Sequence, residues 1–362
     1  MPAPSLLARA KRAYFIAQNV RSFASKEREL HGLPDSWADL RMLRQGFHSD
    51  KQYLYEHIDG RPHAAYVGDF ERLMMRRLNG PYAPFLDNKV LFSQVFGAYL
   101  PVPRNFGLLR RDALNPLDPV VPSAPRETAL LLPELPDQFV LKRVAGGGGK
   151  NIYLIDRDSD CLRVNGHAMD LDVLLERLGT ATYLVTELLG QGAYATGLFP
   201  GSLNTVRVVT MQDDEGPFVG FAVQRIGTSR SAPTDNLNQG GLAAPVELAD
   251  GTLGDARHLE ADRVAEPHAL HPETSAPITG LTVPHWERVT SMLLDALEHF
   301  PGLRYVGWDV VLGEEGLTVL EANTYPGVQV AQLHYPLRTD RRVAAFFEET
   351  TAATHPLRRA ST

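Results

Sequence analysis

The sequence contains a single cysteine, Cys161, among its 362 residues. One thiol excludes an intramolecular disulfide framework and a zinc site built from several cysteines. No run approaches the roughly 18 to 20 consecutive apolar residues of a membrane-spanning helix, so we expect no integral membrane span. The chain does not open on a charged segment followed by a long hydrophobic one, so we expect no secretory signal and a cytoplasmic location.

Neither sign of charge is in large excess. Lysine and arginine number 36, aspartate and glutamate number 43, and the formal net charge is −7 at pH 7. A surface of this charge does not attract nucleic acid in general, so no nucleic-acid partner is expected. Hydrophobic residues make up 44% and charged residues 22%, which is typical of a folded globular protein. At roughly 150 residues per domain, the length predicts two to three domains.

Residues 1–84 are expected to form a helical N-terminal region. Over residues 4–28, six apolar residues recur at steps of three or four with basic residues between them, namely Leu7, Ala10, Tyr14, Ala17, Val20 and Phe23. This spacing predicts an amphipathic helix. Its basic face is expected to be a solvated surface on a helix that packs against the body, with an anionic membrane as the alternative. Ser36 and Asp69 are expected to cap two further helices.

The rest of the chain predicts an α+β fold. Short β-branched or aromatic runs bounded by glycine, proline or charge predict strands at 139–142, 152–155, 183–188, 205–211 and 218–224, and a hairpin that joins 305–312 to 317–321. The proline-rich stretch 116–136 is expected to be a linker. We divide the chain into the N-terminal region, a small lobe at 85–190, a larger lobe at 191–345 and a C-terminal tail at 346–362.

A glycine-rich loop follows the strand that contains Lys142. The loop consists of Gly146, Gly147, Gly148, Gly149 and Lys150. Because these glycines lack Cβ atoms, their N–H groups can close around a phosphate, and the flanking lysines add positive charge. Asn151 replaces the Ser or Thr that would hold magnesium in a P-loop. The loop therefore predicts a nucleotide site of another type, with a flexible turn as the alternative.

Acidic side chains gather on the C-terminal hairpin. Asp309 can stand near Glu321 across an antiparallel ladder, and Glu321 and Asn323 project to one face because strand side chains alternate. Two carboxylates in an apolar hairpin repel each other unless they share a cation, and Mg²⁺ bound together with substrate phosphates suits this arrangement. The hairpin predicts a Mg²⁺ site, with a solvent-facing pair of acids at a sheet edge as the alternative.

Taken in chain order, these segments resemble the ATP-grasp superfamily. The resemblance is carried by Lys142, the glycine loop, Thr186-Glu187-Leu188-Leu189, Asn204-Thr205-Val206-Arg207, Asp309, Glu321 and Asn323. More narrowly, residues 202–210, Asp235-Asn236 with Gly240-Gly241, and Gly307-Trp308-Asp309 are similar to the sugar-transfer-associated ATP-grasp branch. The resemblance covers about residues 85–340. It implies an ATP-grasp fold in which two α+β lobes clasp ATP behind the helical N-terminal region.

The resemblance also implies roles for individual residues. It places the nucleotide at Lys89, Lys142, Gly146, Gly147, Gly148, Gly149, Lys150, Glu187 and Leu189. It places Mg²⁺ at Asp309, Glu321 and Asn323, and the reacting groups beside Arg207 and Arg225. Asn236 is expected to bind a polar ligand from its loop, with a plain surface turn as the alternative.

The activity implied by this resemblance is that of an ATP-dependent ligase. Such an enzyme joins a small-molecule carboxylate to an amine or a thiol through an acyl phosphate, with ATP and Mg²⁺ as cofactors and with release of ADP and phosphate. Two alternatives are a kinase or phosphotransferase and an ATP-binding regulatory protein, either of them in surface polysaccharide assembly. The substrates and the oligomeric state, including a homodimer, are left open.

Overall fold

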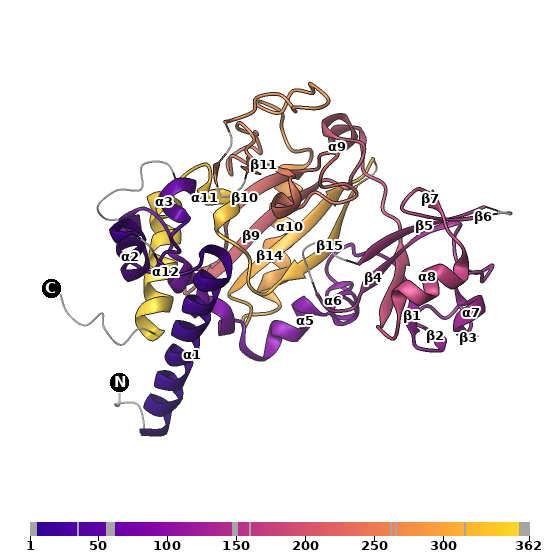
Figure 1. The fold of residues 1–362 in the computed structure, drawn as a ribbon, viewed down its shortest axis with the longest axis horizontal. Helices are drawn as coiled ribbons and strands as arrows, with labels where there is room; N and C mark the ends of the chain where they lie inside the picture. The colour runs from indigo at the N-terminus through magenta and orange to yellow at the C-terminus, as the bar shows by residue number, and fades with distance from the viewer. Residues whose placement is uncertain are drawn as a thin grey trace.

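Two antiparallel sheets with helices packed on them make up an α+β fold (Figure 1). The computed structural model describes residues 6–34, 36–55, 62–146, 151–158, 161–260, 263–264, 266–314 and 316–354. Within these ranges no helix has both the length and the apolar character needed to cross a bilayer.

The smaller lobe is an eight-stranded sheet whose neighbouring strands are all antiparallel. In spatial order the strands are β3 (Ala124–Pro125), β2 (Ala113–Pro116), β1 (Asn105–Arg110), β8 (Tyr183–Glu187), β4 (Gln138–Arg143), β5 (Ile152–Asp158), β6 (Cys161–Val164) and β7 (His167–Ala168). Two helices, α7 (Arg126–Ala129) and α8 (Leu171–Leu178), add apolar residues to the core on one face. The opposite face is therefore free to take part in a site.

Residues 116–136 are part of this lobe, so the expected linker is wrong. Val121, Ala129, Leu130 and Leu135 are buried in the same core as the strand residues. The prolines mark turns in this stretch, but the apolar residues between them still pack against the sheet, because burial is favourable wherever the backbone brings them to the core.

The larger lobe is a five-stranded sheet, again with every neighbouring pair antiparallel. Its strands are β11 (Leu242–Pro245), β10 (Gly216–Ile226), β9 (Thr205–Asp213), β14 (Tyr305–Leu312) and β15 (Leu317–Asn323). β14 and β15 confirm the expected hairpin. One face is covered by α10 (Trp286–Glu298) and α6 (Lys89–Phe96), around the fully buried Trp308. α9 (Ala193–Leu198) adds Leu198 to this core, whereas the short pair β12 (Leu259–Glu260) and β13 (Arg263–Val264) lies against the N-terminal helices, where Leu259 packs.

The N-terminal region is helical as expected and packs at one end of the larger lobe (Figure 1). It contains α1 (Leu6–His31), α2 (Trp37–Arg44), α3 (Lys51–Leu54) and α4 (Asp69–Met74), and α5 (Ala83–Asp87) leads from it into α6. Ser36 caps α2, because its Oγ accepts a hydrogen bond from the Asp39 N–H at 3.1 Å. The expected cap at Asp69 is wrong. Asp69 is the first residue of α4 and its carboxylate accepts from the His48 N–H at 2.9 Å.

The packing groups the chain differently from the expected boundaries at two places. Phe92, Phe96 and Leu100 are buried against the five-stranded sheet, so residues 85–100 pack with the larger lobe. Residues 346–354, expected in a tail, continue α12 (Arg341–Thr354), which follows the short α11 (Gln329–Gln332) and buries Phe346 and Phe347. Both stretches are helical segments whose apolar side chains find a core outside their assigned unit.

Candidate functional site

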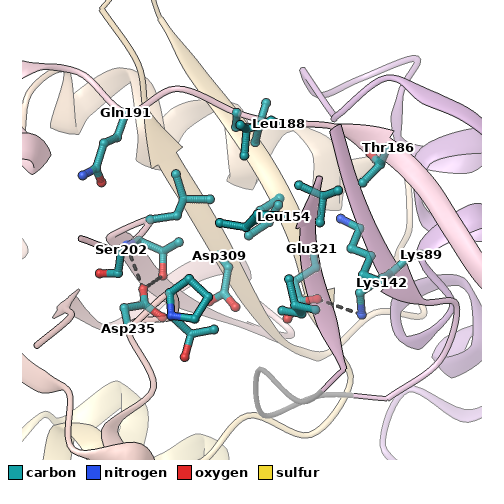
Figure 2. A pocket seen from close by; sticks show the side chains of 18 of the residues that line it. Lys89, Lys142, Leu154, Thr186, Leu188, Gln191, Ser202, Asp235, Asp309 and Glu321 are labelled. Carbon is teal, nitrogen blue, oxygen red and sulfur yellow. Dashed lines mark hydrogen bonds and ion pairs between the residues drawn. The ribbon is translucent and has the colours of Figure 1, made fainter. Parts of the chain in front are cut away.

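A cavity of about 610 Å³ opens between the two sheets (Figure 2). The eight-stranded sheet contributes Val140, Lys142, Ile152, Leu154 and Thr186 to its wall. The five-stranded sheet and its hairpin contribute Thr205, Arg225, Asp309, Leu320 and Glu321. The segment that joins the lobes, residues 187–191, contributes Glu187, Leu188, Leu189 and Gln191. The cavity thus has one wall from each lobe and a closed side at their connection.

Strand alternation decides which residues of the smaller lobe face the cavity. Val140 and Lys142 on β4 line it, whereas Phe139 and Leu141 between them are buried in the core of the lobe. Side chains at every second position share a face, so a lysine two residues after a valine reaches the same wall. This places a cation on an otherwise apolar surface.

A row of charged residues crosses three strands of the larger lobe. Arg207 on β9 is the direct partner of Asp309 on β14, which in turn is the partner of Glu321 on β15. Direct partners in antiparallel strands lie on one face. Arg207 donates two hydrogen bonds to Asp309, one of them from Nη2 to Oδ2 at 2.8 Å. A bidentate ion pair therefore joins Arg207 to Asp309, and this is the strongest geometry for an arginine and a carboxylate.

Arg225 extends the row into a buried network. It donates to Asp309 Oδ2 at 3.2 Å and pairs through its other terminal nitrogen with Asp235. Asp235 also accepts from the Thr205 N–H at 2.9 Å. Burial raises the pKa of Asp235, although Arg225 and Thr205 oppose the shift. For Asp309, burial alone would raise the pKa, but Arg207 and Arg225 outweigh it and the pKa is lowered.

Two lysines, Lys89 and Lys142, lie near Glu321, at the end of the row away from Arg207. Lys89 begins α6, where the Asn88 side chain accepts from the Val90 and Leu91 N–H groups at 3.0 and 3.2 Å and caps the helix. The Lys89 ammonium lies 2.9 Å from Glu321 Oε2 and donates to the Gly146 carbonyl at 3.1 Å.

Lys142, by contrast, is 7% exposed. Burial lowers its pKa to about 8; Lys89 acts in the same direction, while Glu321 and Glu187 partly oppose the shift. Lys142 can therefore lose its proton at mildly alkaline pH.

The connecting segment supplies an apolar surface and fixes it to the smaller lobe. The Glu187 carboxylate accepts from the Arg104 N–H at 2.8 Å, and the Thr186 hydroxyl donates to the Arg104 carbonyl at 2.9 Å. Leu154 and Leu188 point into the same space (Figure 2). A slot with apolar walls suits a flat heteroaromatic ring.

The structure brings most of the expected site residues to one place. Those that line the cavity are Lys89, Lys142, Gly146, Glu187, Leu189, Arg225, Asp309 and Glu321. Arg207 does not line it but holds Asp309 from the neighbouring strand. Gly147, Gly148, Gly149 and Lys150 lie outside the described residues.

Asn236 is placed differently from the expectation. Its side chain accepts from the Asn238 N–H at 3.0 Å and closes the short turn Leu237–Gln239, and it is not part of the cavity wall. The preceding residue, Asp235, lines the cavity instead. Asn236 thus takes the turn-closing position that an Asx residue often has, which matches the alternative of a plain surface turn.

The residues that line the cavity without having been predicted to bind a ligand include Gln191, Ser202, Thr205 and Asp235. Alternation along β9 could have indicated Thr205, since it lies two residues before Arg207 and on the same face. Asp235 is a single acid in a polar loop, and only the fold brings it beside Arg225. Gln191 carries no pattern that would single it out, whereas Ser202 lies in a stretch that carried the family resemblance without an assigned role.

The donors on the hairpin fit Mg²⁺ in type. Asp309, Glu321 and Asn323 offer the oxygen ligands that Mg²⁺ takes, and Asn323 follows Glu321 at the alternation distance. The Asn323 side-chain nitrogen is buried without a hydrogen-bond partner in the described ranges, and Asn323 is not among the residues that line the cavity. No group of three or more histidine, cysteine or acidic residues in the described ranges is arranged to hold a metal by itself. The donor set thus suits a cation shared with phosphate oxygens rather than a closed protein cage.

Comparison with known proteins identifies one family. The model of the sugar-transfer-associated ATP-grasp family matches residues 70–343. Curated proteins give no match.

Three solved structures are similar at low identity. A D-alanine–D-alanine ligase from Helicobacter pylori is 13% identical with a TM-score of 0.41, covering 75% of this chain and 62% of that chain. A RimK-domain ATP-grasp protein from Sphaerobacter thermophilus is 15% identical with a TM-score of 0.38, covering 76% and 69%. An ADP complex of N5-carboxyaminoimidazole ribonucleotide synthetase is 12% identical with a TM-score of 0.38, covering 67% and 46%. This chain spans about half the length of that synthetase.

Proposed function

This chain belongs to the sugar-transfer-associated ATP-grasp family, and from that premise we propose that it is an ATP-dependent carboxylate–amine or carboxylate–thiol ligase. The observation that carries the proposal is the convergence of cations and carboxylates from distant segments on one cavity. Lys89, Lys142 and Arg225 meet Asp309 and Glu321 there. Three cations around a cavity of this size suit a polyphosphate, and two carboxylates beside them suit its metal ion.

The nucleotide would lie across the cavity with its base at the connecting segment. The apolar side chains of Leu154, Leu188 and Leu320 would sandwich the adenine ring, and backbone groups of residues 187–189 would read its edge. The phosphates would then extend toward Lys89 and Lys142. In the free protein Lys89 is held by Glu321, so this lysine would exchange a carboxylate for a phosphate on binding.

The residues beside the phosphates suit acyl-phosphate formation. A substrate carboxylate oxygen would attack the γ-phosphorus as the bond to the ADP oxygen breaks, and Arg225 would stabilise the charge on the phosphoryl oxygens. An amine or thiol would then attack the acyl carbon. Phosphate would leave, and the proton from the nucleophile would pass to phosphate or solvent. Asp235 and Asp309 would keep the Arg225 guanidinium in position through both steps.

Magnesium would be held by Asp309, Glu321 and Asn323 and would neutralise phosphate charge. The remaining catalytic contribution would come from this chain's own groups. Asp309 is buried and Arg207 is half-buried, which would strengthen the charge contact between them.

The decisive experiment measures ADP and hydroxamate together. The protein is incubated with ATP, Mg²⁺, hydroxylamine and pools of small carboxylic and amino acids. A ligase gives hydroxamate in step with ADP, because hydroxylamine captures the acyl phosphate. ADP without hydroxamate, dependent on one acceptor, would point to a kinase. Stabilisation of the fold by ATP with Mg²⁺ and no ADP at all would point to a regulatory protein.

A matched pair of variants tests the site. Glu321→Gln removes a metal-binding charge and the partner of Lys89, and we expect it to lower ADP release by about 100-fold or more while the protein stays folded. Glu314→Gln, on the exposed turn of the same hairpin, is the control and should keep full activity. Equal activity in both variants would contradict the placement of the site.

A further inference from the structure

The outward face of α1 is a surface that the catalytic site does not use. A helix repeats its direction nearly every seventh residue, so Leu7, Tyr14, Arg21 and Arg28 form one row along α1. Leu7 is 66% and Tyr14 is 64% exposed, and both arginines are exposed as well. The stripe that the sequence predicts to be buried is therefore largely open, and of its six residues only Phe23 is buried.

The opposite face of α1 explains this orientation. Asn19, Phe23 and Glu27 follow one another at steps of four and are buried. Phe23 stacks on the His48 ring with a centroid distance of 4.4 Å, and Glu27 Oε2 lies 3.0 Å from His48 Nδ1. These contacts fix α1 to the body by its mixed polar face. The apolar residues of the other face are thus left without a partner in the described protein.

Charge is segregated in the same segment. The first 26 residues contain five basic and no acidic residues, whereas the remaining residues contain 31 basic and 43 acidic ones. Within α1, Glu27 is buried against His48, and the exposed Glu29 near the end of the helix pairs with Lys26. A strongly positive segment on a protein of net charge −7 attracts a negatively charged partner.

We propose that α1 docks this protein on an anionic lipid surface. The exposed row has Leu7 and Tyr14 in its first half, which can enter the headgroup boundary, and Arg21 and Arg28 in its second half, which can meet lipid phosphates. Figure 1 shows the N-terminal half of α1 at the periphery of the molecule, away from the cavity between the sheets. The site can therefore remain accessible from solution while the helix is bound.

A second copy of the chain fits this surface less well. Pairing two α1 helices would bring two strongly basic segments together, and like charges at close range are unfavourable. Charge complementarity thus favours a lipid surface over self-association. The proposal is independent of the proposed ligase activity and is tested without any substrate.

The experiment is co-sedimentation of the full chain with vesicles. Phosphatidylcholine vesicles that contain phosphatidylglycerol are compared with pure phosphatidylcholine vesicles, at about 0.05 M and about 0.5 M salt. We expect binding to the anionic vesicles at low salt, with a loss of about tenfold or more at high salt or without phosphatidylglycerol. Equal binding to both vesicles, or binding to neither, would overturn the proposal.

Two double variants separate the apolar and the charged contributions. Leu7→Ser with Tyr14→Ser and Arg21→Gln with Arg28→Gln should each weaken vesicle binding by about tenfold. The control Val120→Ser alters another exposed apolar residue, in the smaller lobe, and should bind as the parent protein does. Circular dichroism and ATP-induced thermal shifts verify that the variants fold. Unchanged binding in both double variants, or sedimentation velocity that shows self-association through α1 without vesicle binding, would refute lipid docking.

Discussion

Two clusters of buried charge lie in this molecule, and they differ in what surrounds them. The first lies on the five-stranded sheet and consists of Arg207, Arg225, Asp235 and Asp309. The second lies among the N-terminal helices and consists of Glu27, His48, Asp50, Lys51 and Asp69. Arg225, Asp235 and Asp309 of the first cluster line the cavity, whereas no residue of the second does.

The first cluster is placed where its charges can meet a ligand, whereas the second cluster joins structural elements to one another. In the second cluster Glu27 accepts from the Ser49 N–H at 3.2 Å in addition to its contact with His48, and Lys51 Nζ lies 2.8 and 2.7 Å from the two oxygens of Asp50. These contacts join α1 to the segment before α4. In the first cluster the arginines hold carboxylates that face open space, so a ligand can exchange with them. Burial of charge is therefore not evidence of function unless a cavity adjoins it.

The largest expected effect comes from removing the centre of the cavity cluster. Asp309→Ala leaves two buried arginines without their shared partner, and we expect a loss of about 3–5 kcal/mol in the free energy of unfolding together with a loss of about 10³-fold in hydroxamate formation. Urea denaturation and the hydroxamate assay measure the two effects. Asp309→Asn keeps the shape and one acceptor, so it should recover part of the stability and none of the activity. Full activity in Asp309→Ala would remove this cluster from the site.

Removing a charge from the N-terminal cluster should lower stability without changing ATP affinity. Glu27→Ala removes two buried contacts, and we expect a loss of about 2–3 kcal/mol in the free energy of unfolding with unchanged ATP affinity per folded molecule. The matched control is Glu29→Ala, two residues further along α1, whose exposed ion pair with Lys26 contributes less than about 1 kcal/mol. A change in ATP affinity in Glu27→Ala would show that the two clusters are coupled.

Much of the cavity could be predicted because local rules position it. Strand alternation places Glu321 and Asn323 on one face, and an antiparallel hairpin places Asp309 opposite Glu321, as the register confirms. The presence of the strands that carry Lys142 and Arg207 also follows from runs of β-branched residues. These features depend on neighbours in sequence or across one turn, so a sequence is enough to derive them.

The rest depends on contacts between distant segments. The apolar spacing of α1 is correct as a helix signal, but the side that packs is chosen by Phe23 and Glu27 through His48, which the spacing does not reveal. In the same way Asp235, rather than Asn236, lines the cavity because Arg225 lies on the adjoining strand. Tertiary partners decide which face of an element is buried, and a single sequence contains no record of them.

A smaller effect is expected from pH, through Lys142 of the cavity. Contact with a phosphate would favour the protonated ammonium, so bound ATP should raise the pKa of Lys142 above its value of about 8 in the free protein. Affinity for ATP should therefore be flat from pH 7 to 8 and fall by up to about tenfold per pH unit above it. Isothermal titration in the presence of Mg²⁺ measures this slope. Lys142→Arg, which stays protonated, should remove the slope.

Through Lys142, rising pH should change the stability of the fold in the direction opposite to its effect on ATP affinity. Because the pKa of Lys142 is lower in the folded protein than in the unfolded chain, the unfolded chain binds more protons between pH 8 and 10.5. Its contribution to the free energy of unfolding therefore rises across this range while ATP affinity falls. The N-terminal cluster does not line the cavity, so Glu27→Ala should leave the pH slope of ATP affinity unchanged. If ATP affinity in Lys142→Arg fell with pH as steeply as in the parent protein, the effect would belong to another group.

The smallest effect is expected at the border of the cavity, where two adjacent residues differ in role. Asn236→Ala removes only the acceptor of the Asn238 N–H, and we expect a loss of about 1 kcal/mol in the free energy of unfolding with less than about a twofold change in ATP affinity. Asp235→Ala removes the partner of both Arg225 and Thr205, so its losses should be several times larger. Thermal denaturation and titration with ATP compare the two variants. If Asn236→Ala weakened ATP binding as much as Asp235→Ala does, the ligand would have to reach the turn, and the border of the site would lie beyond Asp235.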